Sequence, residues 1–165
     1  MTGRRRAGRE AGMNAGLPHT VRTARPEDYD TVIAVVDAWW GRPASRDLTR
    51  VFVDHFYETS LIAEEPGGAL AGFLIGFLSP SESSQAYVHF AGVAPHLRRS
   101  GLARALYERF FARAREDGRT VVKALTSPVN ERSIAFHAAL GFEVSEPLPD
   151  YDGPSLDRVT FRKRL

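Results

Sequence analysis

The chain has 165 residues, a formal net charge of +2 at pH 7 and no cysteine. This length allows one ordinary domain with a single core. The lack of cysteine excludes disulfides, thiolate catalysis and Cys-ligated zinc. No apolar run approaches the roughly 20 residues that a membrane-spanning helix requires, so we expect no membrane contact and a cytoplasmic location.

The N-terminal segment 1–16 is rich in Arg, Gly and Ala and lacks the apolar stretch of a secretory signal. We interpret it as a disordered tail that precedes a single domain over 17–165, and Met13 could be an alternative start. The arginines of the tail could contact nucleic acid. No aromatic residues or folded basic stripe accompany them, so we expect a solvated tail and no nucleic-acid partner.

The N-terminal half of the domain alternates strand and helix patterns. A short strand is predicted over 19–23, and Pro26 followed by two acids favours a helix start. That helix continues with apolar residues at the spacing of a buried stripe. Residues 41–43 end it, and a second helix is predicted with these residues on one face: Leu48, Val51, Phe52, His55 and Phe56.

The remaining elements are predicted from apolar runs and Gly/Pro breaks. Strands are expected over 60–64, 69–78, 85–93, 120–126, 142–145 and 156–162, and helices over 102–117 and 130–140. The order is therefore β-α-α-β-β-β-α-β-α-β-β, with no internal repeat. This order favours an α/β fold with a mixed sheet and helices on both faces.

The segment between the third long strand and its helix can bind phosphate. A strand ending at Val93 leads into a turn that contains Gly101 and opens directly into a helix. The first N–H groups of a helix lack internal partners and carry partial positive charge, which suits an anion. Arg98 and Arg99 add full positive charge. An ordinary turn with surface arginines remains the alternative.

Two motifs resemble the GNAT acetyltransferases. Arg98-x-x-Gly101-x-Ala103, preceded by Val93-x-Pro95, is similar to the acetyl-CoA pyrophosphate loop of that family. About thirty residues later, the segment 130–142 resembles the family helix Asn-x-x-Ala/Ser-x-x-Phe/Leu-Tyr-x-x-x-Gly-Phe. The resemblance covers roughly Thr20 to Leu165.

The resemblance implies a site for acetyl-CoA as co-substrate between two splayed central strands. The pyrophosphate would be held by backbone amides of Arg98, Arg99, Ser100, Gly101, Leu102 and Ala103. The pantetheine arm would lie beside Asn130 and Ser133, and the amide of Val93 would polarise the thioester carbonyl. No metal is expected, since the histidines show no ligand spacing.

Acetyl transfer requires a base for the amine and a proton for the departing thiolate. The resemblance implies a Tyr acid in the second motif, but this chain has His137 there, on one helical face with Asn130 and Ser133. A histidine can donate a proton near neutral pH. The alternative is that His137 only forms local hydrogen bonds and that Ser133 or a water supplies the proton. On the strand, Tyr87 and His89 share a face, and by the resemblance Tyr87 stands where some family members place a basic Glu. His89 is the candidate base, with a water chain as the alternative.

The acceptor is expected to meet the first two helices. Candidate contacts are Asp37, Trp39, Trp40, His55 and Phe56. Paired tryptophans can bind a cationic or aromatic group, although such residues are also common in cores. The acidic segment 150–152 could attract a cationic amine or could simply be solvated.

These observations predict an N-acetyltransferase that transfers the acetyl group of acetyl-CoA to a primary amine by direct attack in a ternary complex. The acceptor would be a small-molecule amine or a peptide amine. The alternative is a catalytically silent acyl-CoA-binding or regulatory module with the same fold. The resemblance also implies a homodimer, because members of this family often dimerise.

Overall fold

The computed structural model describes residues 18–165. The predicted tail over 1–16 and the alternative start at Met13 lie outside these residues. The described chain divides into two compact units: residues 18–75 with 90–110, and residues 76–89 with 111–165. A single domain over 17–165 stays a prediction, and the two units are described in turn.

The elements follow the predicted order. They are β1 (Thr20–Thr23), α2 (Asp28–Trp40), α3 (Arg50–Phe56), β2 (Leu61–Glu64), β3 (Leu70–Leu78), β4 (Gln85–Val93), α4 (Leu102–Glu116), β5 (Val121–Thr126), α5 (Glu131–Ala139), β6 (Glu143–Val144) and β7 (Val159–Arg164). The strands form one sheet in the order β1-β2-β3-β4-β5-β7-β6. Strands β4 and β5 run parallel, whereas β1–β2, β2–β3, β5–β7 and β6–β7 run antiparallel. The predicted mixed α/β sheet is confirmed. Within residues 18–165, no helix has both the length and the apolar character needed to cross a membrane.

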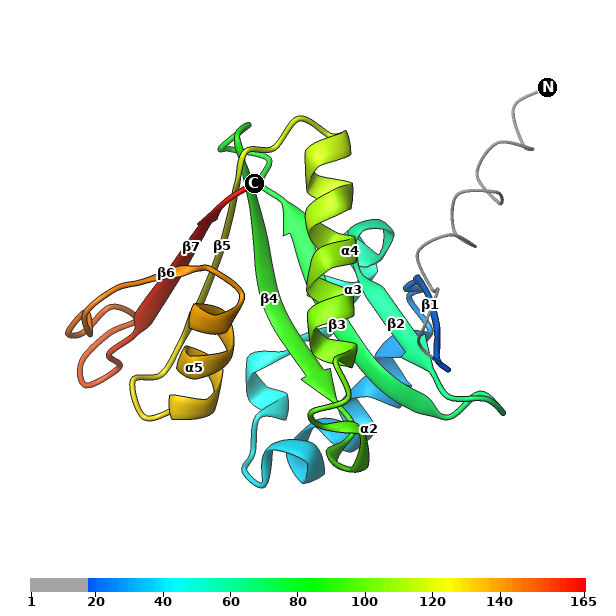
Figure 1. Ribbon diagram of the computed structural model, residues 1–165. Coiled ribbons are helices and arrows are strands. Elements are labelled where there is room, and N and C mark those ends of the chain that lie inside the picture. Colours follow the sequence, from blue (N-terminus) through cyan, green and yellow to red (C-terminus); the bar gives the residue numbers. More distant parts are fainter. Residues whose placement is uncertain (1–17) are drawn as a thin grey trace. The chain divides into compact units, whose positions relative to one another are not determined.

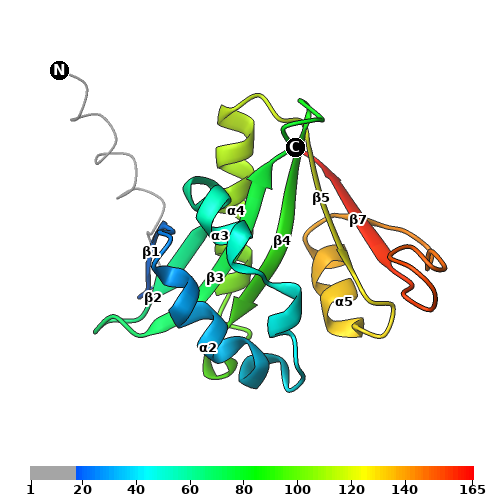
Figure 2. The same ribbon diagram turned by 180° about the vertical axis from the view of Figure 1, so that it is seen from behind.

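In the first unit, helices cover both faces of the strands. Helices α2 and α3 lie on one face, and the N-terminal half of α4 lies on the other (Figures 1 and 2). The alternation of side chains along β3 explains this arrangement. A Cβ at Gly72 would meet Leu102 and Leu106 of α4, at 3.4 Å each. On the opposite face, the ring of Phe73 stacks on Trp39 of α2, with centroids 6.0 Å apart.

Helix α3 buries only part of the predicted apolar face. Val51 was grouped with the apolar face, but its side chain is 52% exposed, whereas Val53 is fully buried. The α-helix begins only at Arg50, after a short 3₁₀ turn over Ser45–Asp47. Leu48 therefore precedes the helix but is buried, and Phe52 packs against the same core, so the predicted face is wrong at Val51 and His55, which are exposed.

In the second unit, β7 pairs with β5 along six positions, from Val159↔Thr126 to Arg164↔Val121. Helix α5 packs beside these strands (Figures 1 and 2). The last strand was predicted over 156–162 but starts at Val159, because residues 150–158 form a loop closed by its own hydrogen bonds. Within that loop, Gly153 N–H donates to the Asp150 carbonyl at 3.1 Å and Leu156 N–H to the Gly153 carbonyl at 2.9 Å.

Candidate functional site

The turn between β4 and α4 is built from residues with unusual backbone angles. Gly101 has φ of +87° and Arg99 has φ of +64°, so two residues in the left-handed region are separated by a single residue. Glycine adopts this conformation without steric cost. A Cβ built at Gly101 meets nothing within 4 Å, so open space lies beside the backbone where α4 begins. A ligand can approach the main chain closely at this point.

The electrostatics of the turn favour an anion. Helix α4 starts at Leu102, and the amides of its first turn have no acceptor within the helix. Ser100 caps one of them, since its Oγ accepts from the Leu102 N–H at 3.3 Å. Arg98, Arg99 and Ser100 are exposed. The guanidinium of Arg98 donates to the carbonyl of Trp39, so it links the turn to the end of α2.

In the second unit, the pairing of β4 with β5 stops early. The parallel register covers three positions and ends at Tyr87↔Lys123, although β5 continues to Thr126. The predicted splay of the central strands requires the backbone pairing of β4 and β5 to end in this way. Beyond it, Asn130 joins β5 to α5: its Oδ1 accepts from the Ser133 N–H at 3.2 Å, and its Nδ2 donates to Thr126 Oγ1 at 3.0 Å.

His137 lies in an apolar environment. The side chain is buried, and its ring stacks on Phe161 with centroids 4.0 Å apart and planes 6° apart. Burial lowers the pKa of His137 to about 4, despite a hydrogen bond to Ser133 that acts in the other direction. The partner is the Ser133 carbonyl, 2.8 Å from Nδ1. A carbonyl only accepts, so the neutral ring carries its proton on Nδ1. These contacts favour a packing role for His137 over a role as proton donor.

Tyr87 and His89 are half-buried on β4. Burial, and then the nearby Tyr151 and Asp152, raise the pKa of Tyr87 well above its usual value. Its phenol therefore stays protonated at neutral pH and can donate a hydrogen bond but cannot serve as a base. The ring of Tyr87 stacks on Phe77, with centroids 5.4 Å apart. His89 is thus the better candidate base of the two.

The predicted acceptor residues lie in the first unit, where the aromatic ones pack in clusters and the polar ones are exposed. Trp39 and Trp40 are half-buried and belong to an aromatic cluster in which Trp40 lies 5.0 Å from Phe90. Phe56 is half-buried and packs against Phe52 with ring centroids 6.3 Å apart.

The polar candidates do not belong to these clusters. The carboxylate of Asp37 accepts from the Ser45 N–H at 2.7 Å and holds the α2–α3 connection. The backbone hydrogen bond from Ser45 is the main reason that the pKa of Asp37 lies below its usual value. His55 is exposed.

Gly92 is a residue that sequence reasoning missed. A Cβ at this position would lie 2.3 Å from the Trp40 ring, so only glycine lets Trp40 lie across β4. Gly92 precedes Val93, whose amide is the expected oxyanion donor. The available signal was a glycine inside a strand, which often marks a close approach of another group.

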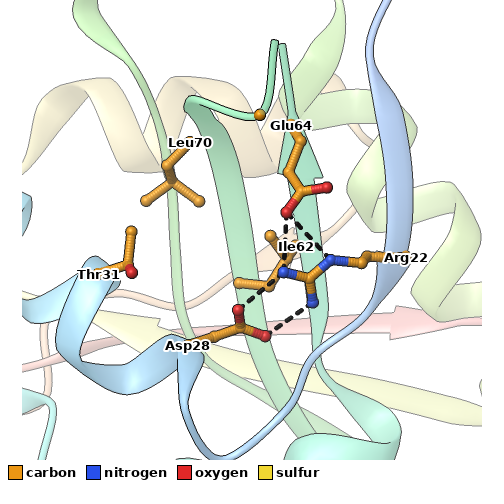
Figure 3. Close-up of a pocket in the computed structure, with 7 residues that line it drawn as sticks. Arg22, Asp28, Thr31, Ile62, Glu64 and Leu70 are labelled. Atoms are coloured by element: carbon orange, nitrogen blue, oxygen red, sulfur yellow. Dashed lines mark hydrogen bonds and ion pairs between the residues drawn. The ribbon is translucent and has the colours of Figure 1, made fainter. Parts of the chain in front are cut away.

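A cavity at the other end of the first unit has a structural role. It measures about 90 Å³ and is bordered by Arg22, Asp28 and Glu64 (Figure 3). The guanidinium of Arg22 bonds both Asp28 oxygens at 2.8 Å and Glu64 Oε1 at 2.9 Å. These bonds join β1, α2 and β2. Within residues 18–165, no group of three or more His, Asp or Glu is placed to hold a metal.

The sequence matches the model of the acetyltransferase (GNAT) family over residues 22–142. The chain belongs to this family. A curated relative is the L-2,4-diaminobutyric acid acetyltransferase of Nocardia farcinica, 35% identical over 85 residues. That match covers 52% of this chain and 44% of the relative, so it spans less than half of the relative's length.

Solved GNAT structures show the same fold. Ard1 from Thermoplasma volcanium superposes with a TM-score of 0.75 at 22% identity, over 90% of this chain and 99% of that one. The structure of yncA from Salmonella typhimurium, described with its cofactor acetyl-CoA, gives a TM-score of 0.69 at 24% identity, over 89% and 94% of the two chains. At these identities, the likeness concerns the fold alone.

Proposed function

We propose that this GNAT protein transfers the acetyl group of acetyl-CoA to a primary amine within a ternary complex. The observation that carries the proposal is the left-handed turn at Gly101, with open space beside it at the start of α4. An amide-lined helix start of this kind suits a pyrophosphate. Membership of the family and the acetyl-CoA in the yncA structure support the choice of donor.

The backbone amides of residues 98–103 would hold the pyrophosphate, and exposed Arg99 would add charge. Arg98 would act mainly by holding the turn against α2, because its guanidinium is bonded to the Trp39 carbonyl. Asn130 and Ser133 would lie beside the pantetheine arm. The amide of Val93 would stabilise the negative charge that develops on the thioester oxygen.

His89 would take the proton that the amine loses. The amine nitrogen forms a bond to the carbonyl carbon, the C–S bond breaks, and coenzyme A leaves as a thiolate. The imidazolium of His89 then returns its proton to the thiolate, directly or through water. Tyr87 would only donate a hydrogen bond, since its raised pKa keeps the phenol protonated. His137 would support the site by packing rather than by supplying the proton.

The acceptor would meet an aromatic surface in the first unit. Trp40 lies against Gly92, directly before the proposed oxyanion donor Val93. Trp39 and Phe56 would extend this surface, and Asp37 would act indirectly by fixing the α2–α3 connection. The relative from Nocardia farcinica is named for a diamino acid, which favours a small-molecule amine over a peptide amine. The homodimer and the cytoplasmic location stay predictions.

The test is amine-dependent release of the free coenzyme A thiol, measured with a panel of amino acids, polyamines and peptides. We expect release with at least one amine and none without amine. One observation favours a competing function, a module that binds acyl-CoA without turnover. His137 is buried at the position where the family motif has a Tyr that acts as general acid. Tight acetyl-CoA binding with no thiol release for any amine would establish that silent module instead.

A further inference from the structure

The side chain of Trp40 lies directly on the backbone of β4. A Cβ at Gly92 would stand 2.3 Å from Cη2 and 2.7 Å from Cζ3 of the indole, so these two ring atoms occupy the place of a side chain at position 92. Neighbouring rings hold the indole there, with centroids at 5.0 Å for Phe90 and 6.1 Å for Phe73. Trp40 is therefore a fixed wall beside the end of β4.

The helix end that carries Trp40 is held by two further contacts. Gly41, with φ of +67°, ends α2, and its N–H donates to the Asp37 carbonyl at 2.9 Å. The guanidinium of Arg98 donates to the Trp39 carbonyl, which ties the same helix end to the proposed pyrophosphate turn. A movement of Trp40 away from β4 would therefore disturb both the helix end and the turn.

The amide of Val93, the proposed oxyanion donor, points away from β3. The next residue, Ala94, donates its N–H to the Ala71 carbonyl at 2.9 Å, which is on the β3 side. Successive N–H groups of an extended chain point to opposite sides, so the Val93 N–H is directed to the other side of β4. Adjacent Cα atoms are about 3.8 Å apart. A thioester oxygen that accepts this N–H therefore lies close to Gly92 and to the ring of Trp40.

The two faces of β4 differ in the space that they leave here. Helices α4 and α2 cover opposite faces (Figures 1 and 2). On the α4 side, Leu102 and Leu106 pack over Gly72, next to the Gly92 carbonyl, and are only 1% exposed each, so this side is filled. On the α2 side, Gly92 has no side chain and Trp40 is only half-buried. The accessible surface beside this part of β4 is thus the indole of Trp40.

We propose that Trp40 limits the acyl group of the donor to two carbons. This inference rests on the proposed function and specifies its donor. With the thioester oxygen on the Val93 amide, the methyl group of an acetyl donor contacts the indole, and a longer acyl chain meets ring atoms Cη2 and Cζ3. A longer donor then binds only if its thioester leaves the Val93 amide. One methylene in such a site changes specificity by about 10- to 200-fold.

The experiment measures donor binding without an amine, so that contacts between Trp40 and the acceptor do not contribute. Calorimetry gives the Kd of coenzyme A, acetyl-CoA, propanoyl-CoA and butanoyl-CoA for the full chain. We expect the wild type to bind acetyl-CoA at least tenfold more tightly than butanoyl-CoA. Trp40→Phe keeps an aromatic ring but removes the part of the indole that lies over Gly92. It should bring the Kd values of these two donors within about threefold of each other.

Trp39→Phe is the matched control. Trp39 is the neighbouring indole of the same helix end and stacks on Phe73, but none of the three atoms nearest to a Cβ at Gly92 belongs to it. We expect this variant to keep the wild-type ratio of the acetyl-CoA and butanoyl-CoA affinities. An equal change of this ratio in both variants would show a general loosening of α2 and would overturn the inference. Equal affinity of the wild type for all three acyl donors would overturn it too.

Thiol release separates this inference from the proposed function. Equal kcat/KM for acetyl-CoA and butanoyl-CoA with an accepted amine would keep the proposed function and overturn the role of Trp40. Discrimination by acyl length in binding, without thiol release for any amine, would keep the role of Trp40 and reject acetyl transfer.

Discussion

At the scale of single residues, a substitution can show whether His137 packs in the core or donates a proton, the role that its position in the motif suggests. Its ring is stacked on Phe161 and its Nδ1 proton is directed to the Ser133 carbonyl. His137→Phe keeps an aromatic ring and removes the proton. We expect its kcat to stay within about threefold of the wild type, whereas loss of a general acid costs about 10²–10⁴-fold. A hundredfold fall in kcat with an unchanged melting temperature would support proton donation by His137 instead.

Gly101 allows a test of the pyrophosphate turn with an internal control. Gly118, at the other end of α4, has φ of +78° and the same open surroundings as Gly101 at +87°. Alanine at either position should cost about 1 kcal/mol of stability because of the left-handed backbone. Only Gly101→Ala should weaken acetyl-CoA binding, by tenfold or more, and Gly101→Trp should abolish it. Calorimetry checks this, and equal affinity in both alanine variants would refute the turn assignment.

The site could be predicted only in part from single residues. The turn at Gly101 was predictable because a glycine between a strand and a helix indicates a left-handed turn, which is a local property of the backbone. The burial of His137 was missed, because stacking on Phe161 joins residues 24 positions apart in the chain. The bond from Arg98 to the Trp39 carbonyl joins residues even further apart. Local patterns carry no information on such contacts.

At the scale of elements, one guanidinium binds three carbonyls of the turn between β3 and β4. Arg119 Nη1 lies 2.9 Å from the Ser79 carbonyl, 3.2 Å from that of Glu82 and 3.3 Å from that of Gln85. Its side chain is only 14% exposed. The turn also has hydrogen bonds of its own, such as that from the Ser79 N–H to the Gln85 carbonyl at 3.0 Å, and Arg119 adds three further bonds from outside the turn.

Arg119→Met should lower the free energy of unfolding by about 2 kcal/mol, since it removes the hydrogen bonds of a charged group to three backbone carbonyls. Amide hydrogen exchange over residues 79–85 should become faster. Asp117→Asn is the control, because it removes only the partly exposed ion pair to Arg119 and should cost less than about 1 kcal/mol. Unchanged exchange in the Arg119→Met variant would show that the turn is held by other contacts.

Element boundaries were predictable where local pattern and packing agree. Strand β4 and the start of α4 match the predicted bounds, because an apolar run and a glycine mark them. The predicted face of α3 was wrong at Val51 and His55, which are exposed, whereas Val53 is buried. The last strand was displaced because the hydrogen bonds of the 150–158 loop remove those residues from the sheet. The second error comes from short-range geometry that apolar patterns do not encode.

At the scale of the whole molecule, His137 and Asp28 contribute to the response of stability to acid in different pH ranges. Burial lowers the pKa of His137 to about 4. Between about pH 4 and 6.5, this histidine is therefore protonated in the unfolded chain but neutral in the folded chain. For Asp28, burial would raise the pKa, but hydrogen bonds from Arg22 and from the backbone of Arg25 together hold it below its usual value. The Asp28 contribution is therefore present above about pH 4 and is lost at lower pH.

The free energy of unfolding should consequently rise with pH between about 4 and 6.5, by about 3 kcal/mol from His137 alone. Urea unfolding at pH 4.5, 5.5 and 7.0 measures this slope. His137→Phe should flatten it, because the variant has no group that titrates at this position. Asp28→Asn should lower stability at all three pH values and keep the slope, since wild-type Asp28, whose pKa lies below its usual value, is ionised throughout this window. A His137→Phe variant with the wild-type slope would show that other groups control the pH dependence.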